Sequence, residues 1–238
     1  MNANCPMPAN PHGPTPLKDS CIAVIAAGNS RRMGICKQTL DLAGEAMVHR
    51  ACRIALDADP GEVFLICGRD YDAISHTVSN LPVDCAYNGL YETGQAASVR
   101  MAANLALAGG YASLCIIPAD MPFLTAGHLT RLAEGLRRPG MIAAASATRP
   151  ALVPMAPCLF APEAMRLLCD LQGDRGALQV IRNPSIRPKV AIVPFDDPLM
   201  AFDVDTPEDY AQVLALVSQA KRPAQQSDPR RHRKEARP

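Results

Sequence analysis

The sequence contains no tryptophan, and aromatic residues make up only 4% of its 238 residues. Its hydrophobic core must therefore be built from Ala, Leu, Val, Ile and Met, which the hydrophobic fraction of 48% supplies. The charged fraction of 20% is ordinary for a globular protein. A chain of this length can bury a sizeable core as one large domain or two small ones.

Long apolar segments are also missing. No apolar run is long enough to cross a bilayer, and the first residues lack the basic-then-apolar pattern of a secretory signal. We therefore expect a cytoplasmic protein that does not contact the membrane. Five prolines between Pro6 and Pro16, without apolar periodicity, predict a disordered leader over residues 1–19.

The nine cysteines form no C-x-x-C pair, and no histidine stands at ligand spacing from them. Most lie in apolar runs, where a free cysteine is a small hydrophobic residue, so we expect neither a disulfide framework nor a zinc site. Cys36 is the exception, because it stands among basic residues that favour a lowered pKa of its thiol. A loop position that tolerates cysteine is the simpler interpretation.

Charge is unevenly spread, although the formal net charge is only +1. From Lys221 onward there are seven basic and two acidic residues, which predicts a solvated, disordered tail over residues 221–238 behind a folded domain over residues 20–220. A nucleic-acid binder acting through this tail is an alternative. We do not favour it, because the acidic body offers no aromatic platform for stacking bases, and we expect no nucleic-acid partner.

Short apolar runs alternate with helical patterns along the body of the chain, which predicts an α/β fold with a Rossmann-like, mostly parallel sheet flanked by helices. The expected strands cover residues 22–27, 62–67, 83–86, 113–117, 141–148, 153–160 and 190–194. The expected helices cover residues 46–58, 70–78, 95–108, 125–137, 162–171 and 207–220.

The first apolar run opens into a basic, glycine-containing loop, IAVIAAGNSRRMGICK, over residues 22–37. A strand that ends at Gly28 exposes backbone N–H groups, which can form an anion site. Arg31, Arg32 and Lys37 add positive charge, and arginine fits phosphate oxygens. The loop therefore predicts a polyphosphate cradle, although its spacing matches neither the P-loop nor the dinucleotide fingerprint.

Acidic residues follow two later strands or extended segments. Asp120 stands between Pro118 and Pro122 after a central apolar run, where an acid points into the ligand crevice of an α/β sheet. With a polyphosphate nearby, its partner would be Mg²⁺; a cap for the next helix is the alternative. Asp203 and Asp205 face one side of an extended chain, just before a helix start at Thr206-Pro207 that does not explain them.

The start of the helix over residues 95–108 is a further candidate site. Ser98 lies in its first turn, where free N–H groups and the helix dipole favour an anion. A plain helix start is the alternative interpretation.

Together these stretches resemble the molybdenum-cofactor nucleotidyltransferases, the MobA-like NTP transferase family. The family's opening signature, A-A-G-x-S-x-R-M-G-x-x-K, is matched by Ala26, Ala27, Gly28, Ser30, Arg32, Met33, Gly34 and Lys37. The family's D-x-D-T-P-E-D motif is matched from Asp203 onward. The cytidylyltransferase branch is further resembled by Asn88, Tyr91, Gly94 and Ser98, and by the run Gly173-Asp174-Arg175-Gly176-Ala177. A glycine that commonly faces the acceptor is missing before Pro157.

The resemblance implies a nucleotide-diphospho-sugar transferase type of fold (GT-A-like) and transfer of a nucleoside monophosphate, CMP from CTP, to the phosphate of a molybdopterin-type acceptor. It implies catalytic roles for Arg32, Lys37 and Asp120, and Mg²⁺ held by Asp120 and Asp205. The implied nucleotide-binding residues are Ala26, Ala27, Gly28, Asn29, Ser30, Arg32, Lys37, Asn88 and Ser98.

Other functions stay open at this point. The acceptor could be another phosphorylated metabolite. The nucleotide that donates the monophosphate could be GTP in place of CTP. The chain could also be a non-catalytic module that holds finished cofactor and contacts a molybdenum hydroxylase transiently to deliver it. Such a module would not need both Asp120 and Asp205.

Overall fold

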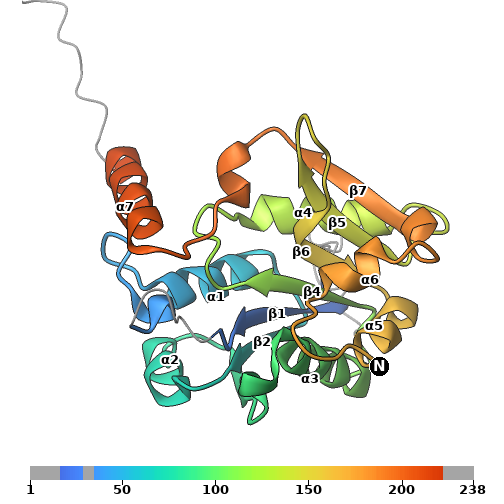
Figure 1. Ribbon diagram of the computed structural model, residues 1–238, viewed down its shortest axis with the longest axis horizontal. Helices are drawn as coiled ribbons and strands as arrows, with labels where there is room; N and C mark the ends of the chain where they lie inside the picture. Colours follow the sequence, from blue (N-terminus) through green and yellow to red (C-terminus); the bar gives the residue numbers. More distant parts are fainter. Residues whose placement is uncertain (1–16, 29–34, 222–238) are drawn as a thin grey trace, which may run out of the picture.

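The computed structural model describes residues 17–28 and 35–221, which form one seven-stranded sheet with helices against it (Figure 1). The strand order is β3-β2-β1-β4-β6-β5-β7. The strands are β1 (Ser20–Ala26), β2 (Glu62–Cys67), β3 (Asp84–Tyr87), β4 (Ser113–Pro118), β5 (Ala143–Thr148), β6 (Met155–Phe160) and β7 (Val190–Phe195).

The sheet is mostly parallel. β1 pairs in parallel with β2 and β4, β2 with β3, and β5 with β7. β6 alone among these strands runs antiparallel to its neighbours β4 and β5. This arrangement confirms the predicted fold class, and it brings the carboxyl ends of β1 and β4 to one edge of the sheet.

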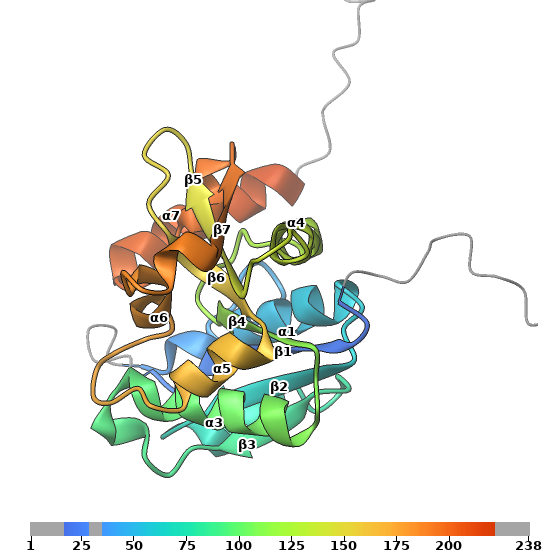
Figure 2. The same ribbon diagram turned by 90° about the vertical axis from the view of Figure 1, so that its right-hand side faces the viewer.

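Helices cover both faces of the sheet, as the rotated view shows (Figure 2). The helices are α1 (Met47–Asp57), α2 (Tyr71–Thr77), α3 (Gln95–Ala108), α4 (Ala126–Leu136), α5 (Pro162–Leu168), α6 (Leu178–Arg182) and α7 (Pro207–Lys221). α1, α2 and α4 pack on one face, and α3, α5 and α6 pack on the other.

Alternation along β1 explains the two-sided core. Ile22 and Val24 face the cluster with α1, α2 and α4, whereas Cys21 and Ala23 face the cluster with α3, α5 and α6. Small residues in the core let helices approach the sheet closely. A Cβ on Gly135 of α4, for example, would lie 2.5 Å from a methyl carbon of Val193.

A third, smaller cluster attaches α7 to the rest of the molecule. It consists of the fully or nearly fully buried residues Leu42, Met47, Val204, Val213 and Val217. Val204 belongs to the D-x-D segment, so this cluster also fixes the position of the acids on either side of it.

A disordered leader was predicted over residues 1–19, but the folded part already includes Leu17, which is fully buried in the core. The eight cysteines that the structure describes are free thiols. Within the described ranges, each helix is too short or too polar to span a lipid bilayer. The tail predicted beyond Lys221 lies outside the described residues.

Candidate active site

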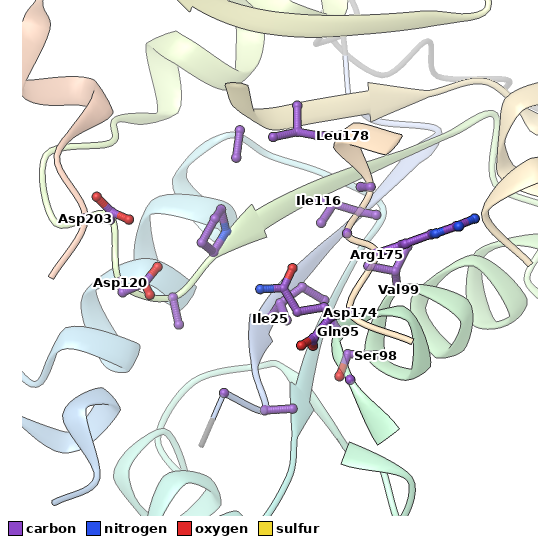
Figure 3. Close-up of a pocket in the computed structure, with 18 of the residues that line it drawn as sticks. Ile25, Gln95, Ser98, Val99, Ile116, Asp120, Asp174, Arg175, Leu178 and Asp203 are labelled. Atoms are coloured by element: carbon purple, nitrogen blue, oxygen red, sulfur yellow. The ribbon is translucent and has the colours of Figure 1, made fainter. Parts of the chain in front are cut away.

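A cavity of about 920 Å³ lies beyond the carboxyl ends of β1 and β4. The turn after β1 contributes Gly28 to its wall, the turn after β4 contributes Asp120, and the first turns of α3 contribute Ser98. Asp120 and Asp203 lie at one end of the cavity, and Ser98 and Asp174 lie at the other (Figure 3). This is where open α/β sheets bind ligands.

The Lys37 ammonium is enclosed by three oxygen atoms at the acidic end. Nζ lies 2.6 Å from Oδ2 of Asp120, 2.8 Å from Oδ1 of Asp205 and 2.8 Å from the carbonyl oxygen of Val204. The side chain of Lys37 is only 9% exposed, against 22% for Asp120 and 44% for Asp205. The structure therefore brings together three residues that the sequence analysis assigned to catalysis and metal binding.

Local structure holds Lys37 in this place. It begins a short 3₁₀ helix, η1 (Lys37–Thr39), whose turn is closed by a hydrogen bond from the Leu40 N–H to the Lys37 carbonyl. The Thr39 hydroxyl donates to the Cys36 carbonyl at 3.1 Å, which fixes the backbone just before Lys37.

Two sets of backbone hydrogen bonds hold Asp120 and Asp205 in place. The Val204 N–H donates to the Asp120 carbonyl at 3.0 Å, which joins the D-x-D segment to the turn after β4. Asp209 in the first turn of α7 accepts from the N–H groups of Asp205 and Thr206 at 3.1 and 2.8 Å, and Thr206 accepts from the Asp209 N–H at 3.2 Å. This reciprocal cap explains why the T-P-E-D run follows Asp205, since it fixes the backbone that carries the carboxylate.

The electrostatics follow from this crowding. Burial would lower the pKa of Lys37, but the charges of Asp120 and Asp205 and their hydrogen bonds outweigh it, so its pKa is raised. Burial, and then the negative charges of Asp120 and Asp205, raise the pKa of Asp203. The acidic end therefore disfavours the ionised form of Asp203, first by burial and then by the two neighbouring carboxylates, and a bound cation would offset this.

These residues fit a divalent metal. Asp120 and Asp205 already share one cation, the Lys37 ammonium, so their oxygens converge on one point. In the described part of the chain, no three His, Cys, Asp or Glu side chains are grouped to hold a metal by themselves. Mg²⁺ typically uses one or two carboxylates and takes its other ligands from phosphates and water, which matches this donor set.

Asn88 and Ser98 meet at the other end of the cavity. The Asn88 amide donates to the Ser98 hydroxyl at 2.9 Å, and both residues are buried. The Asn88 side-chain oxygen accepts from the Leu90 N–H at 3.0 Å. Ser98 lines the cavity, so Asn88 orients Ser98 and the loop that leads to α3 and does not form the wall itself.

The run Gly173–Ala177 packs against the start of α3 and lines the cavity from Asp174 onward. The Ala96 N–H donates to the Gly173 carbonyl at 3.1 Å. A Cβ on Gly94 would lie 2.5 Å from the carbonyl carbon and oxygen of Gly173, so the two glycines allow this close approach. The run therefore joins the nucleotide side of the predicted site to the later half of the chain.

The cradle residues are only partly described. Ala27 and Gly28 line the cavity, and Ala26 is buried at the end of β1. The predicted sites at Asn29, Ser30 and Arg32 lie outside the described residues.

For Cys36, the structure supports the simpler interpretation, a position that tolerates cysteine, over a lowered pKa of the thiol. Burial, and then the charge of Asp70 at the start of α2, raise the pKa of its thiol. Both effects disfavour the thiolate form of Cys36.

The sequence analysis did not single out five polar residues of the cavity wall: Gln38, Glu92, Gln95, Gln179 and Arg182. Gln38 is 2% exposed, and a Cβ on Gly28 would lie 3.8 Å from its Nε2 atom. Gln179 and Arg182 stand three apart on α6, a spacing that marks one helix face. That helix has only five residues, too few for its periodicity to be recognised.

Residues 22–190 match the family model of the MobA-like NTP transferase domain. The chain belongs to this family of nucleotidyltransferases, in which a nucleoside triphosphate is the substrate. A curated relative, the bifunctional protein GlmU of Sinorhizobium fredii, is 32% identical over 126 residues, which are 50% of this chain and 28% of that protein. The chain thus spans little more than a quarter of the curated relatives it matches.

Solved structures share the fold. An Rv0371c homologue from Mycobacterium sp. strain JC1 has a TM-score of 0.74 at 24% identity, covering 86% of this chain and 100% of that one. Rv0371c from Mycobacterium tuberculosis in complex with manganese has a TM-score of 0.67 at 21% identity, covering 82% and 97%. Molybdopterin-guanine dinucleotide biosynthesis protein A from Archaeoglobus fulgidus has a TM-score of 0.60 at 21% identity, covering 84% and 99%.

Proposed function

We propose that this protein transfers CMP from CTP to the phosphate monoester of a molybdopterin-type acceptor and releases pyrophosphate. One observation carries the proposal: Asp120, Asp205 and Lys37 meet in a cavity whose wall also includes Gly28 and Ser98. A turn at a strand end and a helix start can bind the phosphates of a nucleoside triphosphate, and the neighbouring charged groups can activate it.

Each residue has a definite task in this reaction. The attacking oxygen belongs to a phosphate that is already ionised at neutral pH, so no general base is required. Lys37 would neutralise charge where the acceptor phosphate approaches the α-phosphate, and Ser98 with the start of α3 would hold phosphate or ribose oxygens. Asp120 and Asp205 would hold Mg²⁺, which when bound would neutralise charge on the leaving pyrophosphate.

The choice of CTP rests on motifs. The Ala26-Ala27-Gly28 opening is similar to the cytidylyl branch, and so is the run from Gly173, which lines the cavity from Asp174 onward. By the same resemblance, Asn29, Ser30 and Arg32 would complete the phosphate cradle. The acceptor assignment is supported by family membership and by the similar fold of the Archaeoglobus fulgidus protein named for molybdopterin-guanine dinucleotide biosynthesis. A molybdenum hydroxylase would then receive the finished cofactor.

Pyrophosphate release tests the proposal. The full chain is incubated with Mg²⁺ and CTP, GTP, ATP or UTP, with and without molybdopterin carrying molybdenum. We expect release with CTP that depends on the acceptor and falls at least about 100-fold in Asp120→Asn.

Asp59→Asn is the matched control, because Asp59 is also paired with a lysine, Lys18 at 3.0 Å, but on the exposed surface. It should leave the release unchanged. Release with GTP in place of CTP would overturn the choice of base. Binding of finished cofactor without release from any nucleotide would overturn the catalytic proposal in favour of a delivery module.

A further inference from the structure

The acidic end of the cavity already contains three oxygen atoms arranged around one cation. Asp120 Oδ2, Asp205 Oδ1 and the Val204 carbonyl oxygen lie 2.6, 2.8 and 2.8 Å from Lys37 Nζ. Two carboxylates and a carbonyl are the donor types that a hard divalent cation selects. The ammonium therefore stands where the chain's own geometry would direct a metal.

Lysine and metal are mutually exclusive at this point. Metal–oxygen distances for Mg²⁺ are about 2.0–2.1 Å, shorter than the contacts to Lys37, so the same oxygens cannot surround both ions. Two cations held by the same carboxylates also repel each other. The side chain of Lys37 is 9% exposed, so bulk solvent screens this repulsion poorly.

Lys37 has somewhere else to go. Its side chain lines the same cavity as Gly28 and Ser98, at which we place the polyphosphate. Four rotatable bonds let the ammonium leave the carboxylates while the η1 turn keeps its backbone in place. A bound triphosphate would offer negative charge in exchange for the two carboxylates that the ammonium gives up.

We propose that Lys37 is a resident cation that occupies the metal site of the empty protein, and that it moves to the nucleotide phosphates when the metal binds. This inference rests on the proposed function, because it takes the metal site from there. It makes metal and nucleotide loading cooperative: the metal alone must displace the lysine, whereas the metal with nucleotide gives the lysine a new partner.

A purely structural ion pair makes the opposite prediction. If Lys37 only held Asp120 and Asp205 in position, its removal would spoil the metal site and weaken metal binding. If Lys37 competes with the metal, its removal strengthens metal binding in the absence of nucleotide.

Mn²⁺ binding to the full chain separates the two cases, measured by electron paramagnetic resonance and calorimetry with and without CTP. We expect Lys37→Met to bind Mn²⁺ about 10-fold more tightly than the unmodified protein when no nucleotide is present, because the competing cation is gone. We also expect CTP to increase Mn²⁺ affinity less in Lys37→Met than in the unmodified protein. Lys18→Met, which removes an exposed lysine paired with Asp59, is the matched control and should change neither value.

Equal or weaker Mn²⁺ binding by folded Lys37→Met overturns the inference. A second measurement needs no variant: acetylation of Lys37 relative to Lys18, followed by mass spectrometry, should rise several-fold when Mn²⁺ saturates the unmodified protein, because the displaced amine is exposed. Unchanged acetylation at saturation would mean that lysine and metal coexist, and it too overturns the inference.

These results are independent of turnover. Should the chain fail to transfer any nucleotide while Lys37→Met still tightens Mn²⁺ binding, the proposed function would fall and the competition would stand. Transfer of CMP without tighter binding in Lys37→Met would leave the function standing and remove the competition.

Discussion

Lys37 and Asp205 are 168 positions apart in the sequence, yet the Lys37 ammonium lies 2.8 Å from the Asp205 carboxylate. Asp120 lies on the other side of the same ammonium, at 2.6 Å. The 3₁₀ helix η1, the turn after β4 and the D-x-D segment before α7 are therefore joined at one point. A change in the position of one of these segments therefore alters the contacts of the other two with Lys37.

Removing the charge of Asp203 should stabilise the protein in the absence of metal. The raised pKa of Asp203 shows that the fold disfavours its ionised form, because of burial and the charges of Asp120 and Asp205. Stability should therefore fall as pH rises through this pKa, and Asp203→Asn should remove that fall. Because Asp203 is exposed and solvent screens these charges, we expect a gain of only a few tenths of a kcal/mol at pH 7 in urea unfolding. A loss of stability at pH 7 would contradict the electrostatic account.

The cap at the start of α7 should position Asp205. Thr206→Ala removes the hydroxyl that accepts from the Asp209 N–H, which should cost about 1 kcal/mol of unfolding free energy. It should also reduce Mn²⁺ affinity in the presence of CTP, because the Asp205 backbone is less well fixed. Thr206→Ser keeps the hydroxyl and should restore both values. Equal defects in the two variants would show that the methyl group, and not the cap, matters.

The contact between Gly94 and Gly173 should tolerate no side chain. In Gly94→Ala the new Cβ would lie 2.5 Å from the Gly173 carbonyl group at a φ of +112°, so we expect a loss of about 3 kcal/mol or more.

Gly110→Ala is the matched control for this contact. Gly110 also has a positive φ, +68°, but a Cβ there would meet no atom within 4 Å. It should cost only about 1–2 kcal/mol, the penalty of the left-handed backbone. Thermal unfolding measures both variants, and equal losses would mean that the close approach of Gly173 is unimportant.

Glu45 should give the protein an acid-dependent contribution to stability. Hydrogen bonds from Arg53, at 2.8 and 3.1 Å, and from His49 lower the pKa of Glu45 to about 2. A lowered carboxyl pKa stabilises the fold above the unfolded value of about 4.3, and this contribution is lost as pH falls toward 2.

Glu45→Gln tests this contribution by urea unfolding at pH 7 and pH 2. We expect it to cost about 1 kcal/mol at pH 7, because the group is partly exposed, and almost nothing at pH 2. Glu134→Gln, at an exposed position of α4, is the control. The same cost at both pH values would contradict the assignment to the ionised carboxylate.

Much of the fold could be predicted because apolar runs in this chain are short and end at glycine or proline. The strand over residues 62–67 and the helix over residues 95–108 have the predicted bounds. The five-residue helix α6 was missed because it is shorter than two turns.

The site could be predicted in part. A strand end located Asp120, and the motif that caps α7 located Asp205. The three oxygen atoms around the Lys37 ammonium could not be predicted as a group. One of them is the Val204 carbonyl oxygen, which reaches the site only through tertiary packing. The raised pKa of the Cys36 thiol agrees with the simpler interpretation of that residue, because burial and Asp70 both act against the thiolate.

The central claim is that the α-phosphorus of the nucleotide moves to the acceptor. The most direct test compares CTP labelled at the α-phosphorus with CTP labelled at the γ-phosphorus, incubated with the full chain, Mg²⁺ and molybdenum-bound molybdopterin. The account predicts that the α-label appears on the acceptor and the γ-label appears in pyrophosphate. Label on the acceptor from γ-labelled CTP, or unlabelled acceptor while CTP remains intact, would contradict it.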